Sequence, residues 1–208
     1  MRKHFVKAGR DCNFQEGCVV GMKLREDSEP VRLGKDACIR AGTIIYADVQ
    51  AGDGFQTGHH TLIHEKTVIG NNVVIGSNTV VGSNVAIGDF VRIGSNCHIN
   101  AYTQIDSQVF IGPNVILPSG LHLLYGTSAS KGAIIGSRVI IDAGAIIYPW
   151  VRIGHDTIVE AGSVVFNDVP PYSLVSTSLG QVRPLITNVR EILVYFFSNQ
   201  TKKMIFFD

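Results

Sequence analysis

The chain has 208 residues, enough for one domain with a substantial core. Its 18 basic and 17 acidic side chains leave a net charge of +1, so we expect no nucleic-acid partner. No apolar run approaches the roughly 18 residues that span a bilayer, and the charged N-terminal stretch lacks the apolar core of a signal peptide. The four cysteines show no paired spacing, which favours free thiols in the cytoplasm.

The first segment, residues 1–32, is expected to form an N-terminal cap. A partial repeat at 11–21 is displaced from the register that follows it. The polar stretch 23–30 then ends in proline, which predicts a protruding loop.

A repeat of six residues dominates the segment 33–170. From Leu33 to Val165, 20 of the 23 residues taken at steps of six are Leu, Ile or Val. The fourth residue after each of them is almost always small or β-branched, and glycine often follows directly. A period of six fits neither a helix nor strands joined by hairpins. It predicts short parallel strands in triangular coils of 18 residues, stacked about 4.8 Å apart, and the 23 steps predict seven to eight coils.

The repeat resembles that of a known family. The stretch Ile-Gly-Asn-Asn-Val-Val from Ile69 and the stretch Ala-Gly-Ser-Val-Val from Ala161 are similar to hexapeptide-repeat acyltransferases, in particular the sugar O- and N-acetyltransferases. The resemblance covers roughly residues 33–175. It implies an all-β, left-handed parallel β-helix, a homotrimer, and acyl transfer from acetyl-CoA.

The repeat stops after Pro171, and residues 171–208 are expected to form a tail and a C-terminal helix. Asn188 followed by Glu191 is typical of a helix N-cap, and an apolar segment comes next. We expect this helix to close the open end of the coils. A helix on a membrane surface is the alternative, although membrane contact is not the favoured interpretation.

Positions 18 residues apart should stack in successive coils, which places Gly126, Gly144 and Gly162 in one column. A column without bulky side chains suits the extended pantetheine arm of CoA. A tight corner or a subunit contact is the alternative. By resemblance, the run from Ala161 to Ser163 marks the CoA-binding coil. The predicted cofactor-binding residues are Gly126, Ala143, Gly144, Ala161, Gly162, Ser163 and Arg183.

Arg183 is included because the family pattern changes here. Many members carry Thr-Lys after the Val-Val pair and Gly-x-Pro-Ala-Arg/Lys past the prolines. This chain has Phe166-Asn167 and the run 177–181 instead, so Arg183 is the nearby cation left for the CoA phosphates.

Acyl transfer needs a base near neutral pH, for which histidine is suited. His122 precedes Ala161 by 39 residues, which corresponds to about 10 Å along the stack. It lies in the least regular part of the repeat, and its Gly-Leu-His is an imperfect match to the loop that carries the catalytic histidine in galactoside and maltose acetyltransferases. We predict His122 as the base, with an outward surface histidine as the alternative.

His59 is the second candidate. Its surroundings, residues 57–65, resemble the Gly-His-Asn motif of lipid A acyltransferases and a Thr-Gly-His-x-x-x-Ile-Arg-Glu stretch of sugar-modifying members, with His64 in place of the arginine. The spacing puts it about 27 Å from Ala161. We therefore expect acceptor binding or subunit contact first and catalysis second. His155 is expected at a solvent-exposed corner. If the acceptor amine protonates the thiolate itself, no histidine is essential.

The predicted function is a CoA-dependent acyltransferase, most simply an acetyltransferase, acting on an amino or hydroxyl group of a sugar or nucleotide-linked sugar. A metalloprotein similar to γ-class carbonic anhydrases is one alternative, since His59 and His64 have the spacing of two of its ligands. The third expected histidine is absent between His4 and His59, so we expect no metal. A non-catalytic β-helix scaffold is the other alternative.

Overall fold

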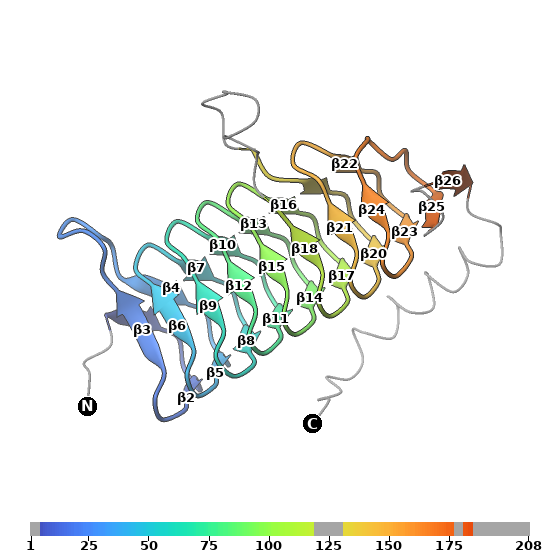
Figure 1. The fold of residues 1–208 in the computed structure, drawn as a ribbon. Coiled ribbons are helices and arrows are strands. Elements are labelled where there is room, and N and C mark those ends of the chain that lie inside the picture. The colour runs from blue at the N-terminus through green and yellow to red at the C-terminus, as the bar shows by residue number, and fades with distance from the viewer. Residues whose placement is uncertain (1–4, 119–130, 177–180, 185–208) are drawn as a thin grey trace.

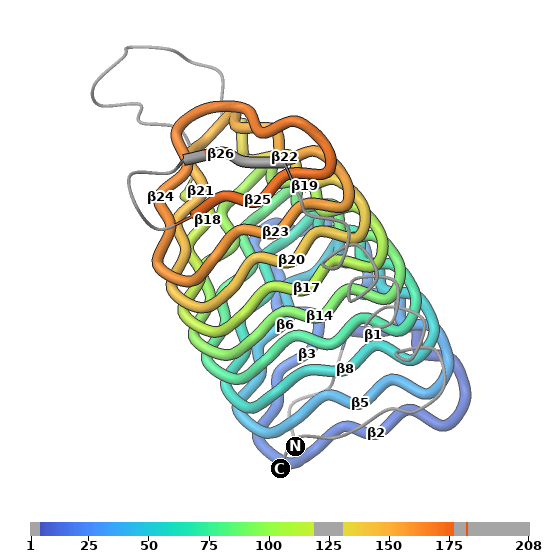
Figure 2. The backbone as a smooth tube through the Cα atoms, turned by 90° about the vertical axis from the view of Figure 1, so that its right-hand side faces the viewer, coloured from blue at the N-terminus to red at the C-terminus, as the bar shows by residue number. Residues whose placement is uncertain are grey.

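The computed structural model describes residues 5–118, 131–176 and 181–184. Over these ranges the chain winds into a left-handed parallel β-helix in the form of a triangular prism (Figures 1 and 2). The predicted fold is therefore confirmed. The predicted C-terminal helix lies outside the described residues. Within the described residues no helix is long and apolar enough to cross a membrane.

Three sheets form the faces of the prism, and we name them A, B and C. Face A contains β1 (Val6–Ala8), β4 (Val31–Leu33), β7 (Gln50–Ala51), β10 (Val68–Ile69), β13 (Ala86–Ile87), β16 (Gln104–Ile105), β19 (Ile134–Ile135) and β22 (Arg152–Ile153). Face B contains β2 (Asn13–Phe14), β5 (Cys38–Ile39), β8 (Gln56–Thr57), β11 (Val74–Ile75), β14 (Arg92–Ile93), β17 (Phe110–Ile111), β20 (Ile140–Ile141), β23 (Ile158–Val159), β25 (Ser173–Ser176) and β26 (Gln181–Pro184). Face C contains β3 (Val19–Met22), β6 (Ile44–Tyr46), β9 (Leu62–Ile63), β12 (Val80–Val81), β15 (His98–Ile99), β18 (Ile116–Leu117), β21 (Ile146–Ile147) and β24 (Val164–Val165).

The three edges of the prism, AB, BC and CA, take their names from the faces that they join. Most turns at these edges have four residues, of which the third has a positive φ, as in Asp36 at edge AB (59°), Gly42 at edge BC (73°) and Asp48 at edge CA (64°). The left-handed region favours glycine and asparagine, which explains their frequency every sixth residue.

The six-residue register is the register of the core. The aliphatic residue of each step points inward and is buried, as are Ile75, Ile93 and Ile111 on face B. Inward threonines satisfy their hydroxyls on the next coil, as when Thr61 Oγ1 donates to the carbonyl of Gly76 over 3.1 Å. Glycine follows many aliphatic residues because the coils touch there. A Cβ on Gly76 would lie 2.5 Å from backbone atoms of Gly94 and Ser95.

Two segments interrupt the stack, and both leave the prism at edge CA. The pairing of Val6 with Val31 shows that seven residues beyond one coil are inserted between β3 and β4. The pairing of Gln104 with Ile134 shows that twelve are inserted between β18 and β19. Figure 1 shows the first insertion as the blue loop that follows β3.

The first insertion changes where the stack begins. Strands β1, β2 and β3 pair in parallel with β4, β5 and β6, so they form a first coil, and seven more coils follow. The coils thus extend into the segment that we expected to be a cap, and residues 23–30 form the loop that displaces the register. At the other end, β25 pairs with β23 in parallel and with β26 in antiparallel fashion.

Candidate functional site

Two of the predicted glycines form an open ridge on edge BC. Gly144 and Gly162 lie one above the other, and the Gly162 N–H donates to the carbonyl of Ala143 over 2.8 Å. Both have a φ of 69°, and a Cβ on either would meet no atom within 4 Å. Ala161 beside Gly162 is also exposed, and Ala143 beside Gly144 is partly exposed. This ridge of small residues is the part of the predicted donor site that the structure brings together.

The column does not continue to Gly126 as the spacing of 18 suggested. The twelve-residue insertion intervenes, and the Gly144 N–H donates to the carbonyl of Pro113 over 2.9 Å. Asn114 therefore occupies the place below Gly144, with the same left-handed backbone (φ 59°). Gly126 itself lies outside the described residues, so its role as a CoA contact stays a prediction.

The remaining residues predicted to contact the acyl donor differ in burial and in position. Ser163 is fully buried and its side chain points into the core, so its hydroxyl does not line the ridge. Arg183 lies opposite Leu174 in the hairpin of β25 and β26, at the C-terminal end of face B. Both glycine N–H groups of the ridge donate hydrogen bonds to carbonyls of the preceding coil. The glycine Cα atoms and the flanking backbone are therefore what a ligand would contact.

His59 lies on the same edge as the glycine ridge, but far from it along the prism. A ladder of hydrogen bonds runs up edge BC, beginning with Asn78 N–H to the His59 carbonyl and ending with Gly162 N–H to the Ala143 carbonyl. It takes five coils to pass from His59 to Ala161, or about 24 Å. The neighbouring His60 packs its imidazole against Gly42, where a Cβ would collide with it.

His64 lies at a different edge, CA, so His59 and His64 do not converge within one chain. The His64 ring stacks on Tyr46 with centroids 4.9 Å apart and planes inclined by 9°. His64 Nδ1 lies 3.7 Å from Glu65 Oε2. Across residues 5–118, 131–176 and 181–184, no three His, Cys, Asp or Glu side chains gather as a metal site would require.

His122 lies outside the described residues, but the structure places the ends of the segment that carries it. The segment leaves the prism after Leu117, at the end of β18, and β18 pairs with β21, which follows Gly144. The insertion therefore leaves edge CA within one coil, about 5 Å, of the height of Gly144. The role of His122 as base stays a prediction.

Sequence reasoning missed a group of aromatic residues on edge CA. Tyr148 and Phe166, one coil apart, have ring centroids 4.5 Å apart, and Phe166 is 60% exposed. Trp150 on the same edge is 39% exposed. We name Tyr148, Trp150 and Phe166 the aromatic shelf. It lies in the two coils that also carry Gly144 and Gly162, and its aromatic spacing of 18 residues was the signal available in the sequence.

A second unpredicted group lies on edge AB. Asp156 accepts two hydrogen bonds from Arg138, of 2.7 and 2.6 Å, and its Oδ2 lies 2.7 Å from Nδ1 of His155. The hydrogen bond from Arg138 is the main cause that holds the pKa of Asp156 below its ordinary value, against the effect of burial. The His155 and Tyr172 rings are T-shaped, with centroids 4.9 Å apart and planes at 88°. His155 lies at a corner, as expected, and its contacts with Asp156 and Tyr172 hold its ring in place.

Comparison with known proteins agrees with this architecture. The model of the bacterial transferase hexapeptide, a unit of six repeats, matches residues 66–101 and 132–167. The two matches lie on either side of the insertion. No curated protein matches the chain.

Among solved structures, UDP-N-acetylglucosamine acyltransferase of Bacteroides fragilis superposes with a TM-score of 0.69 at 15% identity. The match covers 92% of this chain and 73% of that one. A proposed acetyltransferase of Bacillus cereus gives a TM-score of 0.57 at 18% identity, covering 90% and 95% of the two chains. At these identities the likeness establishes the fold. The chain is a left-handed parallel β-helix that carries two segments similar to the bacterial transferase hexapeptide.

Proposed function

We propose that the chain is a CoA-dependent acyltransferase, most simply an acetyltransferase, that modifies an amino or hydroxyl group of a sugar or nucleotide-linked sugar. The repeat type and the fold are those of transferases. The observation that carries the proposal is the open ridge of Gly144 and Gly162. Its exposed surface has no side chain beyond the Cβ of an alanine, so an extended thioester arm can lie against the backbone.

The proposed assembly is a homotrimer with face C toward the threefold axis. Seven of the eight outward residues on this face are apolar: Val19, Ile44, Leu62, Val80, Ile116, Ile146 and Val164. Face A, by contrast, carries outward Lys7, Arg32, Gln50, Gln104 and Arg152. The eighth is His98, which lies between Val80 and Ile116. An apolar column over the rest of one face is the kind of surface that association buries.

A threefold axis against face C would bring the two edges of that face to the neighbouring subunits. Edge BC of one subunit would then meet edge CA of the next. The glycine ridge would face the insertion that carries His122 and the aromatic shelf of a neighbour, all within about two coils of height. Each donor site would be completed by a second copy of the chain.

In this arrangement His122 takes the proton from the acceptor nitrogen or oxygen as that atom attacks the thioester carbonyl. The carbon–sulfur bond then breaks, and the thiolate leaves with a proton from the same imidazole. His59 is too far down edge BC for this step and is assigned to acceptor or subunit contact. The four free cysteines fit a protein of the reducing cytoplasm.

A thermal-shift titration with acetyl-CoA tests donor binding directly. A ligand that binds only the folded state raises the melting temperature as its concentration exceeds the dissociation constant. We expect a saturable rise with acetyl-CoA and with CoA, and none with acetate or adenosine alone. No rise at saturating acetyl-CoA would refute the transferase proposal. Release of the CoA thiol with candidate amino sugars then identifies the acceptor.

A further inference from the structure

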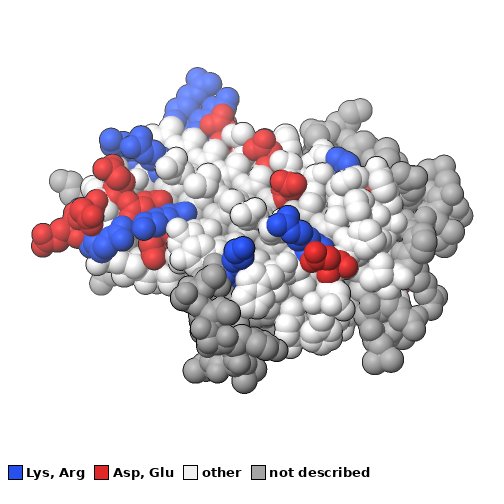
Figure 3. Space-filling view, turned by 90° about the horizontal axis from the view of Figure 1, so that it is seen from above, with Lys and Arg blue, Asp and Glu red and all other residues white. Residues whose placement is uncertain are grey.

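A cavity lies on edge CA, at the opposite end of the prism from the glycine ridge. Its volume is about 230 Å³, below the usual range for drug-sized ligands. The lining residues come from the end of β3, from the loop after it and from the turns of the next two coils: Met22, Leu24, Arg25, Ser28, Ala47, Asp48 and Glu65. Figure 3 shows acidic and basic side chains crowded at this end of the edge.

The loop that covers the cavity is fixed to the prism. Asp48 Oδ1 accepts the N–H of Glu29 over 2.6 Å, and the N–H of Asp48 donates to the carbonyl of Glu29 over 2.9 Å. The Ser28 N–H closes the turn on the carbonyl of Arg25 over 3.4 Å, and Ser28 is buried. The cavity is therefore part of the folded edge.

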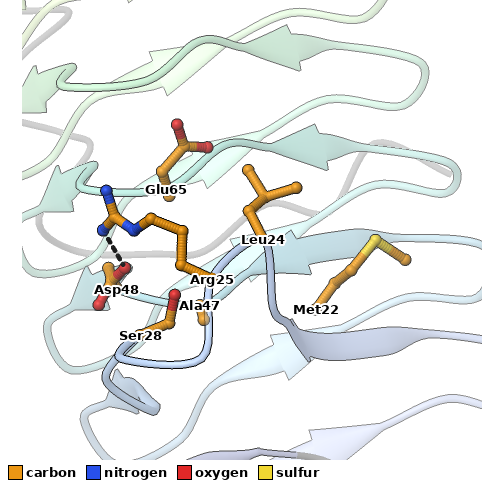
Figure 4. Close-up of a pocket in the computed structure, with 7 residues that line it drawn as sticks. All are labelled: Met22, Leu24, Arg25, Ser28, Ala47, Asp48 and Glu65. Atoms are coloured by element: carbon orange, nitrogen blue, oxygen red, sulfur yellow. Dashed lines mark hydrogen bonds and ion pairs between the residues drawn. The ribbon is translucent and has the colours of Figure 1, made fainter.

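The two sides of the cavity differ in chemistry. In Figure 4, Arg25, Asp48 and Glu65 gather on one side, while Met22 and Leu24 lie on the other. Leu24 is 58% exposed, so the apolar side is accessible from solvent. A ligand that fits both sides has a compact apolar part and a charged group.

The charges in the cavity do not balance. Arg25 lies 3.4 Å from Asp27 and 3.5 Å from Asp48, so its positive charge already faces two carboxylates. Glu65 adds a further negative charge. The lining thus favours a cation over an anion.

Glu65 has an oxygen that the fold leaves without a hydrogen bond. Its Oε2 atom is buried and has no hydrogen-bond partner among the described residues. Nδ1 of His64 lies 3.7 Å from this oxygen, beyond hydrogen-bonding distance. Stacking on Tyr46 holds the His64 ring in this place. A buried carboxylate oxygen without a donor is costly. The Glu65 side chain as a whole is 26% exposed, so its negative charge remains open to a cation in the cavity.

We propose that this cavity binds a small molecule that carries a primary ammonium group on a compact apolar part. The ammonium group pairs with the Glu65 carboxylate, and the apolar part packs on Met22 and Leu24. This site stands apart from acyl transfer, since it needs neither the glycine ridge nor His122.

The test uses the full-length protein labelled with ¹³C at the methionine methyl groups. Met22 lines the cavity, and its resonance is assigned with a Met22→Leu variant. We expect n-butylamine, protonated at neutral pH, to shift the Met22 signal saturably, and the neutral n-butanol to shift it far less. No saturable shift with n-butylamine, or an equal shift with n-butanol, would overturn the proposal.

Two variants distinguish a direct contact between Glu65 and the ammonium group from a general effect of negative charge on the loop. Glu65→Gln should weaken n-butylamine binding at least tenfold, because it removes the charge that meets the ammonium group. Glu26→Gln, an exposed residue of the same loop outside the lining, should leave binding within twofold. Equal binding by wild type and Glu65→Gln would contradict the site. If Glu65→Gln does not fold, Glu65→Asp, which withdraws the carboxylate by one methylene, must weaken binding instead.

Discussion

Arg138 and Asp156 lie 18 residues apart in the chain and form a bidentate ion pair between successive coils of edge AB. One coil separates the two residues, so 18 residues along the chain correspond to one coil along the prism. It also anchors His155, whose Nδ1 lies 2.7 Å from the same carboxylate.

The Arg138–Asp156 pair makes stability depend on pH. The folded state lowers the pKa of Asp156, first through the hydrogen bond from Arg138, so its stabilising effect is present above the ordinary carboxyl value of 3.8. That effect is lost as the pH falls through the lower folded pKa. Asp156→Asn should cost about 1 kcal/mol at neutral pH and progressively less in acid, as measured by urea unfolding. Asp106→Asn, an exposed carboxylate, is the control and should change stability little.

Gly76 is required by the close approach of the next coil. Gly76→Ala would place a methyl group 2.5 Å from backbone atoms of Gly94 and Ser95. Overpacking of this kind costs about 1–3 kcal/mol, which should lower the melting temperature by roughly 2–4 °C per kcal/mol. Calorimetry would check this value. An unchanged melting temperature would mean that the coils are less tightly stacked than described.

The apolar column of face C should hold the trimer together. Val80→Lys places a charge in the middle of this column and should dissociate the assembly, as seen by sedimentation velocity. Val68→Lys on face A is the matched control, since Val68 also points outward and is 52% exposed. A wild-type chain that sediments as a monomer, or dissociation by both variants alike, would refute the proposed seam.

The two candidate histidines should differ in their effect on turnover. Once an acceptor is found, His122→Ala should lower kcat by about 10² to 10⁴ with little change in melting temperature. His59→Ala should act mainly on KM for the acceptor, because five coils separate His59 from Ala161. Loss of kcat in His59→Ala alone would reverse the assignment.

The six-residue register could be predicted because each step places one aliphatic residue in the core, which leaves a direct trace in sequence. The twelve-residue insertion could not, because twelve is a multiple of six and the pattern continues through it. That is why Gly126 was expected below Gly144, where Asn114 lies. The displaced first coil was obscured for the opposite reason, since its seven extra residues break the register.

The exposed groups were harder to predict than the core. Aromatic residues such as Tyr148 and Phe166 meet only because of the stacking of coils, and outward positions tolerate many residue types. The cavity at Glu65 depends on the path of the loop 23–30, which composition alone marks as polar. The six-residue period thus predicts how far along the prism a residue lies and whether its side chain points inward. Contacts between side chains at the edges can be read only from the three-dimensional structure.

The role of the glycine ridge in binding the acyl donor can be tested by a substitution that keeps its backbone conformation. Asparagine already occupies the same turn position on edge BC at Asn78, Asn96 and Asn114, so it tolerates a positive φ there. Gly162→Asn should therefore fold normally and place a side chain across the ridge. Asn96→Gly, three coils below on the same edge, is the reciprocal control.

Isothermal titration of acetyl-CoA into wild type, Gly162→Asn and Asn96→Gly tests the central claim most directly. We predict that Gly162→Asn binds at least tenfold more weakly than wild type and that Asn96→Gly binds as wild type does. Equal affinity for all three proteins would contradict a donor lying along Gly144 and Gly162.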